Sequence, residues 1–383
     1  MDIFSVENEH TSGLYTKQPI IFVRGQGASL WDINGNEYID CSSGHGVANL
    51  GHAHPKVSAA IAEQSTQLVT LFETFYNDKR AALMDVITSL VPGLGKVFFC
   101  NSGTETVEAA LKFARVSTGR TNVIAAMRGF HGRTMGSLSA TFNKKYKEPF
   151  EPLVPGFSHV PYNNINALDA AVTDQVAAVI LEAVQGEGGV YPADPEYLQA
   201  ACRICSERGT LLILDEVQSG LGRTGKLFAF QHSGITPDMV CVAKSLAGGL
   251  PMGAVLFGDS VRNLAPGLHG STFGGNPLSC AAALAALTAI LEEDLAGQAA
   301  AKGAYLMKEL KSIETPLIRE VRGVGLMVGI ELKQKVAPYL AALQERHIIA
   351  LNAGLTTIRL LPPLVITREQ LDHVVQTLKE VLN

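Results

Sequence analysis

The sequence lacks the features of several large classes of protein. It has no stretch rich in lysine and arginine, and its net charge is −5 over 383 residues, so nothing favours binding to nucleic acid or to an anionic membrane. The longest run of small apolar residues, 281–291, is too short to span a bilayer, and the first 25 residues have no apolar core. We therefore expect a cytoplasmic protein that binds any anion at a local site.

Cysteine is also scarce. Six cysteines are scattered along the chain, which suits reduced, buried thiols better than a disulfide framework. Cys202 and Cys205 form a CxxC pair, but the pair falls in a predicted helix and has no second pair of ligands. We interpret the pair as packing, and we expect no metal.

The residues that are abundant indicate a packed α/β protein. Hydrophobic residues make up 47% of the chain, with 37 glycines. Residues 20–50 alternate apolar and polar side chains around Asn34 and Gly35, which predicts a β-hairpin. Between about 55 and 260, short apolar strands (KVFFC, NVIAAM, AAVILEAV, TLLILDEV, DMVCVA) alternate with helices such as TETVEAALKFAR, so we predict a mostly parallel sheet covered by helices.

After about residue 275 the pattern changes to long helices separated by a few strands. This change predicts a second, smaller α+β domain. We divide the chain into an N-terminal segment of the small domain, a large domain, and a C-terminal segment of the small domain, at 1–50, 51–270 and 271–383.

Two reactive side chains stand at the ends of predicted strands. Asp215 ends the apolar strand TLLILDEV, and Lys244 separates DMVCVA from a glycine-rich turn. Ligands of open α/β sheets bind at this edge of the sheet. Asp215 could also ligate Mg²⁺ in a nucleotide hydrolase, but no GxxxxGKS/T loop accompanies it. Burial would favour the neutral amine of Lys244, the form that reacts with a carbonyl.

An anion site and carboxylate anchors accompany these two residues. Ser102, Gly103 and Thr104 begin a predicted helix, whose free amides would bind a phosphate, and Ser102 with Glu105 also fits a capping box. Phe130 and Val217 could flank a flat ring. The planar guanidinium of an arginine can donate two parallel hydrogen bonds to a carboxylate. Two arginines lie in loops bounded by glycine or proline, Arg133 and Arg359.

A lysine, a facing carboxylate, an anion cup and ring-flanking side chains are together what pyridoxal 5'-phosphate requires of a protein. The rival is a dinucleotide enzyme, suggested by the glycines of residues 323–329. Their spacing does not match GxGxxG, and they lie late in the chain. We therefore predict a pyridoxal phosphate enzyme.

The motifs NSGTE, FHGRT, EAVQGEGG, LDEVQSGLGRTGKLFAF, AKSLAGGLPMGA, HGSTFGGNP and IRLLPPL resemble those of the class III aminotransferases, in the acetylornithine and ornithine branch. The resemblance runs nearly end to end. It implies a fold-type I homodimer with active sites at the subunit interface. It also implies a ping-pong reaction in which the terminal amino group of an N2-blocked ornithine or lysine, foremost N-acetylornithine, passes to 2-oxoglutarate.

The resemblance assigns roles residue by residue. Lys244 matches the Schiff-base lysine, and Asp215 the partner of the pyridine nitrogen. Arg133 matches the anchor of the distal carboxylate, while Arg359 binds the α-carboxylate of glutamate and is masked by Glu187 when the amine binds. The remaining contacts to cofactor or substrate are Ser102, Gly103, Thr104, Gln218, Thr272 of the neighbouring subunit, Tyr15, Glu182 and Ser271.

Some positions depart from the family. Ala183 stands where the family usually has proline, and Thr106 and Val107 where the branch commonly has alanine and asparagine. Other stretches, such as REVRGVGLMVGIEL, are similar to thermophile enzymes that act on lysine or ornithine linked to a carrier protein. The alternatives are therefore a carrier-linked lysine aminotransferase in lysine biosynthesis, a broad ω-amine or 4-aminobutyrate transaminase, an aminomutase, and a noncatalytic cofactor-binding protein.

Overall fold

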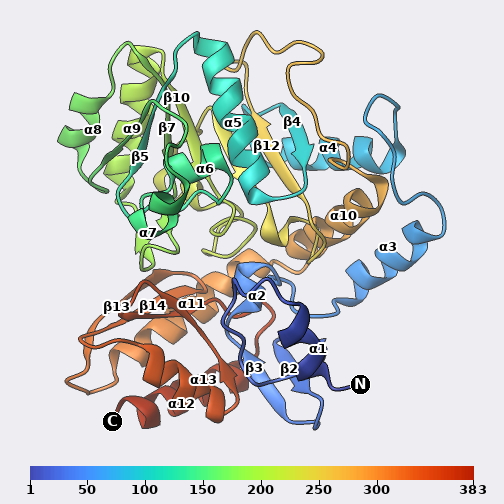
Figure 1. The fold of residues 1–383 in the computed structure, drawn as a ribbon, viewed down its shortest axis with the longest axis vertical. Coiled ribbons are helices and arrows are strands. Elements are labelled where there is room, and N and C mark those ends of the chain that lie inside the picture. The colour runs from blue at the N-terminus through green and yellow to red at the C-terminus, as the bar shows by residue number, and fades with distance from the viewer.

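The computed structural model describes residues 1–383, and Figure 1 shows a larger upper body above a smaller lower one. The upper body is built on a seven-stranded sheet. Its strands lie in the order β4 (Lys96–Cys100), β12 (Gly253–Phe257), β11 (Met239–Val242), β10 (Leu211–Asp215), β7 (Val176–Leu181), β5 (Asn122–Ala126) and β6 (Phe157–Val160).

Neighbouring strands in this sheet are parallel except at β12, which runs antiparallel to both β4 and β11. The five strands expected from sequence are confirmed as β4, β5, β7, β10 and β11. Strands β6 and β12 were not predicted from the sequence. The mostly parallel sheet is confirmed.

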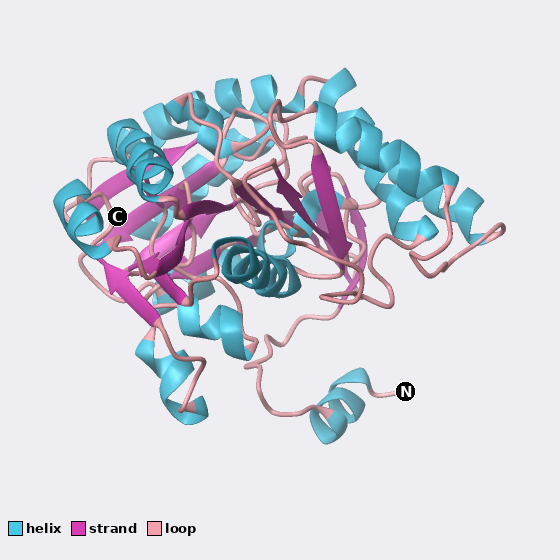
Figure 2. Cartoon of the chain, turned by 90° about the horizontal axis from the view of Figure 1, so that it is seen from above, coloured by secondary structure: helices cyan, strands magenta, loops and turns pink.

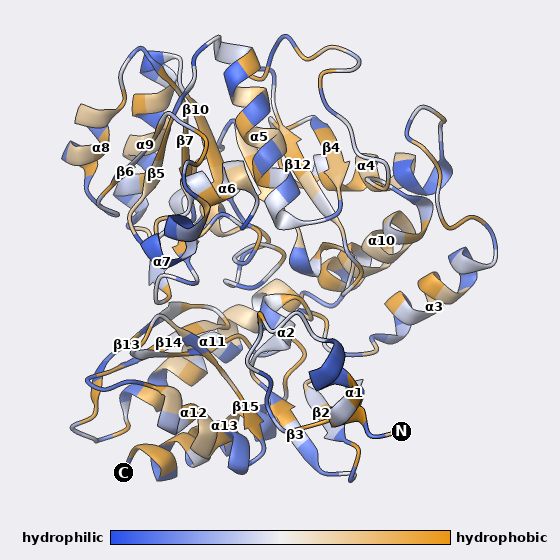
Figure 3. Cartoon of the chain, viewed as in Figure 1, coloured by the Kyte–Doolittle hydropathy of each residue, from blue (hydrophilic) through white to orange (hydrophobic).

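Helices cover both faces of this sheet, as the strand β10 illustrates. Leu212 and Leu214 belong to one apolar core and Leu211 and Ile213 to a second, because successive side chains of a strand point to opposite faces. The first core includes α9 (Pro195–Arg208) and the second α5 (Gly103–Thr118). Figure 2 shows the strands enclosed by helices, and Figure 3 shows the apolar strands inside the upper body. The other helices of this body are α3 (Pro55–Ser65), α4 (Asp78–Ser89), α6 (Met135–Ala140), α7 (Lys144–Lys147), α8 (Ile165–Ala171) and α10 (Pro277–Glu292).

The lower body joins the two ends of the chain. Strand β15 (Ile348–Ile349) pairs in parallel with β3 (Glu37–Asp40), which continues the antiparallel strands β2 (Ser29–Asp32) and β1 (Phe22–Gln26). A second sheet has the order β13 (Ile318–Val324), β14 (Met327–Leu332), β17 (Thr357–Leu360) and β16 (Leu351–Ala353). The helices here are α1 (Ile3–His10), α2 (Ser43–Gly46), α11 (Leu295–Lys311), α12 (Ala337–Glu345) and α13 (Arg368–Leu382).

Buried polar contacts hold the two bodies together. The fully buried guanidinium of Arg223 donates to the carbonyl of Leu326 at 3.0 Å, to the carbonyl of Pro362, and to Asn49 Oδ1 at 2.6 Å. Arg223 lies in the loop after β10, whereas its three partners lie in the N- and C-terminal thirds of the chain. No helix is both long and apolar enough to cross a membrane.

Candidate active site

Five loops meet at the carboxyl edge of the large sheet. Asp215 ends β10, Glu182 follows β7, and Lys244 comes just after β11. Ser102 follows β4, and Phe130 lies in the loop after β5. A cavity of about 400 Å³ lies here. It is lined by Gly103, Thr104, Phe130, His131, Gly132, Arg133, Thr134, Glu182, Glu187, Asp215, Val217, Gln218 and Lys244.

Lys244 has an unusual backbone for a residue with a side chain. Its φ of +45° lies in the left-handed region, which costs a non-glycine residue on the order of 1 to 3 kcal/mol and persists where the surrounding structure fixes it. Burial lowers the pKa of Lys244 to about 8, against the opposing charge of Glu187 and with the help of Arg359. A much larger fraction of Lys244 is therefore a neutral nucleophile near pH 8 than for an ordinary lysine.

Asp215 is held by two donors. Its Oδ2 lies 2.8 Å from Nδ1 of His131, and its Oδ1 accepts the backbone N–H of Val217 at 3.1 Å. The imidazole of His131 is buried, so this contact fixes the direction of the carboxylate. His131 was not among the site residues predicted from the sequence. Its only signal was its place between Phe130 and Arg133 in the motif FHGRT.

The N-terminus of α5 forms the predicted anion cup. Ser102 caps the helix by accepting the N–H of Glu105 at 3.3 Å, but the capping box was wrong in its other half. The Glu105 carboxylate accepts the N–H of Asn101 at 2.5 Å instead of returning to Ser102. Thr104 Oγ1 lies 2.8 Å from the hydroxyl of Thr134. The cup thus combines free helix amides with hydroxyl groups.

Arg359 lies on β17 and reaches the site from the lower body. Its side chain is fully buried, and its Nη1 donates to Glu187 Oε1 at 2.6 Å and to Gln218 Oε1 at 3.0 Å. Its Nε and Nη2 are buried without a partner. Burial would raise the pKa of Glu187, but the charge and hydrogen bond of Arg359 lower it. Two donors of a buried arginine therefore remain available to a carboxylate.

Arg133 is an exposed side chain at the mouth of the cavity. Its guanidinium packs 3.6 Å from the ring centre of Tyr146 on α7 and also lies over Phe130. Such stacking orients a guanidinium while leaving its N–H groups free for a carboxylate.

Five expected site residues are not part of this lining. Ser102 directly precedes Gly103, and Arg359 contacts the lining residues Glu187 and Gln218. The other three lie away from the cavity. Tyr15 is 80% exposed in the segment after α1. Ser271 and Thr272 line a different cavity of about 460 Å³ together with Asn101, Glu105 and His269. Within one chain, these three residues are separate from Lys244.

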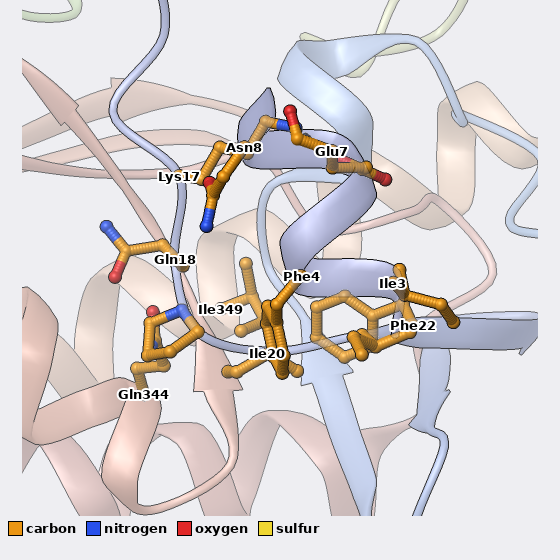
Figure 4. A pocket seen from close by; sticks show the side chains of 12 residues that line it. Ile3, Phe4, Glu7, Asn8, Lys17, Gln18, Ile20, Phe22, Gln344 and Ile349 are labelled. Carbon is orange, nitrogen blue, oxygen red and sulfur yellow. Dashed lines mark hydrogen bonds and ion pairs between the residues drawn. The ribbon is translucent and has the colours of Figure 1, made fainter. Parts of the chain in front are cut away.

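A cavity of about 530 Å³ lies under α1, and Figure 4 shows its lining. Apolar side chains such as Phe4, Ile20 and Ile349 line it, and its charged pair, Glu7 with Lys17, is joined by a salt bridge. It has no cluster of reactive groups. The cavity around Lys244 is therefore the candidate active site despite its smaller volume.

The residues around Lys244 fit pyridoxal phosphate. A side chain added at Gly132 would lie 2.5 Å from the hydroxyls of Thr104 and Ser137, and one at Gly103 2.7 Å from Val217. Only glycine therefore allows the loop, the cup and Val217 to pack this closely at the wall of the cavity. A lysine with a lowered pKa, a fixed carboxylate and an anion cup thus line one cavity. This fold and this site define a pyridoxal phosphate-dependent enzyme of the α/β class.

Sequence comparison gives the family. A sequence model of the class-III aminotransferases matches residues 12–382, and the chain belongs to this family and is an aminotransferase. It is 51% identical to a LysW-aminoadipate semialdehyde transaminase of Deinococcus radiodurans, over 99% of this chain and 90% of the relative. It is 44% identical to an acetylornithine aminotransferase of Methanothermobacter thermautotrophicus, over 100% of this chain and 98% of the relative.

Solved structures agree with this assignment. An ornithine aminotransferase of Toxoplasma gondii superposes with a TM-score of 0.95 at 35% identity, covering 99% of this chain and 94% of that chain. A further structure of that enzyme is described as having partial occupancy of pyridoxal phosphate at its active site. The fold-type I architecture and the cofactor expected from sequence are therefore confirmed.

Proposed function

We propose that this aminotransferase moves the terminal amino group of an N2-blocked ornithine or lysine to 2-oxoglutarate. The observation that carries this proposal is the contact between buried Arg359 and Glu187 beside the Lys244 cavity. Glutamate has a carboxylate next to the reacting carbon, whereas a terminal amine has none. An arginine paired with a carboxylate that can move away serves both substrates.

The roles of the residues follow from their positions. The amides and hydroxyls of Ser102, Gly103 and Thr104 would hold the phosphate, Asp215 would face the ring nitrogen, and Gln218 would reach the ring hydroxyl. Phe130 and Val217 would flank the ring. When bound, the cofactor supplies an electron sink for the negative charge that develops at the substrate carbon.

Lys244 then acts as nucleophile and as proton carrier. Its amine would hold the cofactor between turnovers and, once released, would take the proton from the substrate carbon next to nitrogen. Its neighbours Glu187 and Arg359 set the charge around it. Arg133, at the mouth, would bind the carboxylate at the far end of the donor.

The blocking group is an acetyl group or a small carrier protein. The acetyl group is supported by several acetylornithine aminotransferases at 41 to 46% identity. The carrier is supported by the relative of Deinococcus radiodurans at 51% identity, whose name includes LysW. Both groups remove the positive charge at N2 and direct the terminal amine toward Lys244.

A scan of the first half-reaction tests the donor class. Holoenzyme is mixed separately with N-acetylornithine, N-acetyllysine, ornithine, 4-aminobutyrate and an arylamine, and the visible absorbance of the bound cofactor is followed. We expect the N2-acetylated diamines to react at least about tenfold faster. Ornithine brings a positive charge at N2 into the cavity, 4-aminobutyrate has its carboxylate one carbon nearer the amine, and the arylamine has no carboxylate for Arg133. A cost of about 1.4 kcal/mol for any of these differences is a factor of about ten. Faster reaction of the unblocked amines would instead indicate a broad ω-amine transaminase.

The pH dependence of cofactor uptake tests the depressed pKa of Lys244. Protonated lysine cannot attack the cofactor's aldehyde, so the rate of uptake by the apoenzyme should rise about tenfold per pH unit below 8 and level off above it. Free Nα-acetyllysine, with a pKa near 10.4, is the control for ionisation of the cofactor itself. A rate that climbs in parallel for both amines up to pH 10 contradicts the prediction.

We also propose that the enzyme is a homodimer. The segment between α3 and α4 exposes several large apolar side chains, among them Phe72 at 58% and Phe75 at 62%, and contiguous exposed apolar surface marks interaction sites. Thr272 is proposed to reach the phosphate in the neighbouring subunit, and Tyr15 and Ser271 the substrate there. Sedimentation should give a dimer for the native chain and a monomer for F72E/F75E. Leu355→Glu, at another exposed apolar residue, should leave the dimer intact.

A further inference from the structure

Arg322 on β13 is a buried arginine to which the proposed reaction gives no role. Its Nε and Nη2 both donate to the backbone carbonyl of Gly189, at 2.9 and 2.7 Å. Gly189 comes two residues after Glu187, in the turn between the short antiparallel strands β8 (Val184–Gln185) and β9 (Tyr191–Pro192). A guanidinium from the lower body thus binds the turn that carries Glu187.

Arg322 and Arg359 belong to one row of paired residues across their sheet. Arg322 on β13 pairs with Gly329 on β14, and Gly329 pairs with Arg359 on β17. Directly paired residues point to the same face of a sheet, so both guanidiniums extend from one face, on strands about 10 Å apart. A side chain at Gly329 would lie 3.0 Å from the Val190 side chain and 3.2 Å from the Gly189 carbonyl oxygen. The turn therefore lies directly over this row.

Other contacts fix the direction of the Arg322 guanidinium. Its Nη1 donates to Glu331 Oε2 at 2.5 Å and to Glu320 Oε2 at 2.8 Å, and its central carbon lies 3.8 Å from the ring centre of Tyr191. The hydroxyl of Tyr191 donates to the same oxygen of Glu331 at 3.1 Å. All three guanidinium nitrogens of Arg322 thus have partners, whereas two nitrogens of Arg359 have none. Arg322 is a support for the turn, and Arg359 is free to receive a ligand.

The backbone of the turn needs such a support. Val190 has a φ of +58°, which is an outlier for a β-branched residue and persists only where the surrounding structure fixes it. Its side chain is fully buried in a small apolar cluster with Met327 of β14. The carbonyl that Arg322 binds belongs to the peptide group between Gly189 and Val190. The arginine therefore holds the turn at its strained peptide.

We propose that Arg322 is the positioning residue for the movement of Glu187. It holds the Gly189 end of the turn in place, so that the Glu187 carboxylate covers Arg359 when the amine binds and leaves it when glutamate binds. Glu187 has a glycine on each side, which lets it move while Gly189 stays bound. Without Arg322 the whole turn would move, and Arg359 would spend more time uncovered. This role rests on the proposed function, because it assumes that Glu187 covers Arg359.

Binding of glutarate to the holoenzyme tests this role without turnover and without an amine donor. Glutarate has the two carboxylates of 2-oxoglutarate but no keto group, so it can bind Arg359 and cannot accept an amino group. Isothermal titration calorimetry gives its dissociation constant. Arg322→Gln should bind glutarate about three- to tenfold more tightly than the native enzyme, because Glu187 competes less for Arg359. Glu187→Gln, which removes the competing charge itself, should also tighten binding.

Two further variants make this measurement specific. Arg319→Gln is the matched control, because Arg319 lies on the same strand and also pairs with Glu331, at 3.0 Å, but is exposed and makes no hydrogen bond to the turn. It should bind glutarate as the native enzyme does. The double variant R322M/E331L removes the support without leaving an unpaired buried charge. It should tighten glutarate binding as Arg322→Gln does, and it replaces that variant where the single change prevents folding.

The result for Glu187→Gln separates the two ways in which the proposal can fail. Native affinity in both Arg322 variants, together with tighter binding in Glu187→Gln, overturns the role of Arg322 alone. Native affinity in Glu187→Gln as well overturns the covering of Arg359, and the role of Arg322 with it. The identity of the amine donor is tested independently by the scan of donors, since glutarate binding needs no amine.

Kinetics of the two half-reactions separate positioning from a general loss of structure. The amine is the donor that reacts fastest in the scan. In both Arg322 variants KM for this amine should rise and KM for 2-oxoglutarate should fall, because the two substrates use the covered and uncovered states of Arg359. The kcat of each half-reaction should stay within about twofold of the native value. A common fall of kcat in both half-reactions with unchanged KM values contradicts the positioning role.

Discussion

Replacing Lys244 by alanine is expected to reduce turnover by a factor on the order of 10⁶, the scale of loss when a covalent nucleophile is removed. The substitution removes the only lysine in the cavity, and with it both the link to the cofactor and the carrier of the substrate proton. The visible absorbance of the bound cofactor should disappear as well. Absorbance spectra and single-turnover rates of the purified protein measure both effects.

The fold of this variant should remain intact. The buried amine of Lys244 loses solvation on folding, as its lowered pKa indicates, so its removal does not take away a stabilising charge. Lys226→Ala, at an exposed lysine in the same domain, is the matched control and should keep full activity. Turnover in Lys244→Ala within tenfold of the native rate excludes the proposed mechanism.

Arg359→Ala should weaken the half-reaction with glutamate and 2-oxoglutarate about 30- to 150-fold, since a bidentate contact to a carboxylate is worth roughly 2 to 3 kcal/mol. The half-reaction with the terminal amine should change far less, because that substrate uses the state in which Glu187 covers the arginine. Rapid mixing of each substrate with holoenzyme measures the two rates separately.

Two variants make the test specific. Arg368→Ala removes an exposed arginine that pairs only with its helical neighbour Asp372 and the ring of Tyr305, and neither half-reaction should change. Glu187→Gln should impair the amine half-reaction more than the glutamate half-reaction, the reverse of Arg359→Ala. Equal losses in both half-reactions for Arg359→Ala refute the proposal that Arg359 binds glutamate and 2-oxoglutarate but not the terminal amine substrate.

The site residues that were predicted best from the sequence are reactive side chains at the ends of apolar strands. Asp215 and Lys244 interrupt apolar strands, and polar residues at such ends converge in any open α/β sheet. The strand β12 was missed because the glycine and proline residues around it resemble a loop, whereas the structure inserts it antiparallel between β4 and β11. The domain limits near residues 50 and 270 stay a prediction.

Contacts between distant residues could not be derived from local pattern. Arg359 and Glu187 lie on separate bodies of the chain, and only the family resemblance suggested that they meet. His131 resembled an ordinary core histidine, and its contact with Asp215 depends on how the loop after β5 crosses β10. Glu105 was expected to complete a capping box, but its carboxylate reaches the amide before the cap. Each outcome is decided by tertiary geometry.

The pairing of β3 with β15 constrains how this chain can fold during synthesis. Ile39 lies opposite Ile348 in a parallel ladder. The outer edge of β3 therefore cannot pair until nearly the whole chain has been synthesised. At a typical rate of synthesis the delay is roughly 15 to 60 s. The large sheet, complete by residue 257, can form before that. The outer edge of β3 is thus among the last strand edges to be paired, although β1, β2 and β3 can pair with one another early. During this interval that open edge is exposed to mispairing and to capture by chaperones.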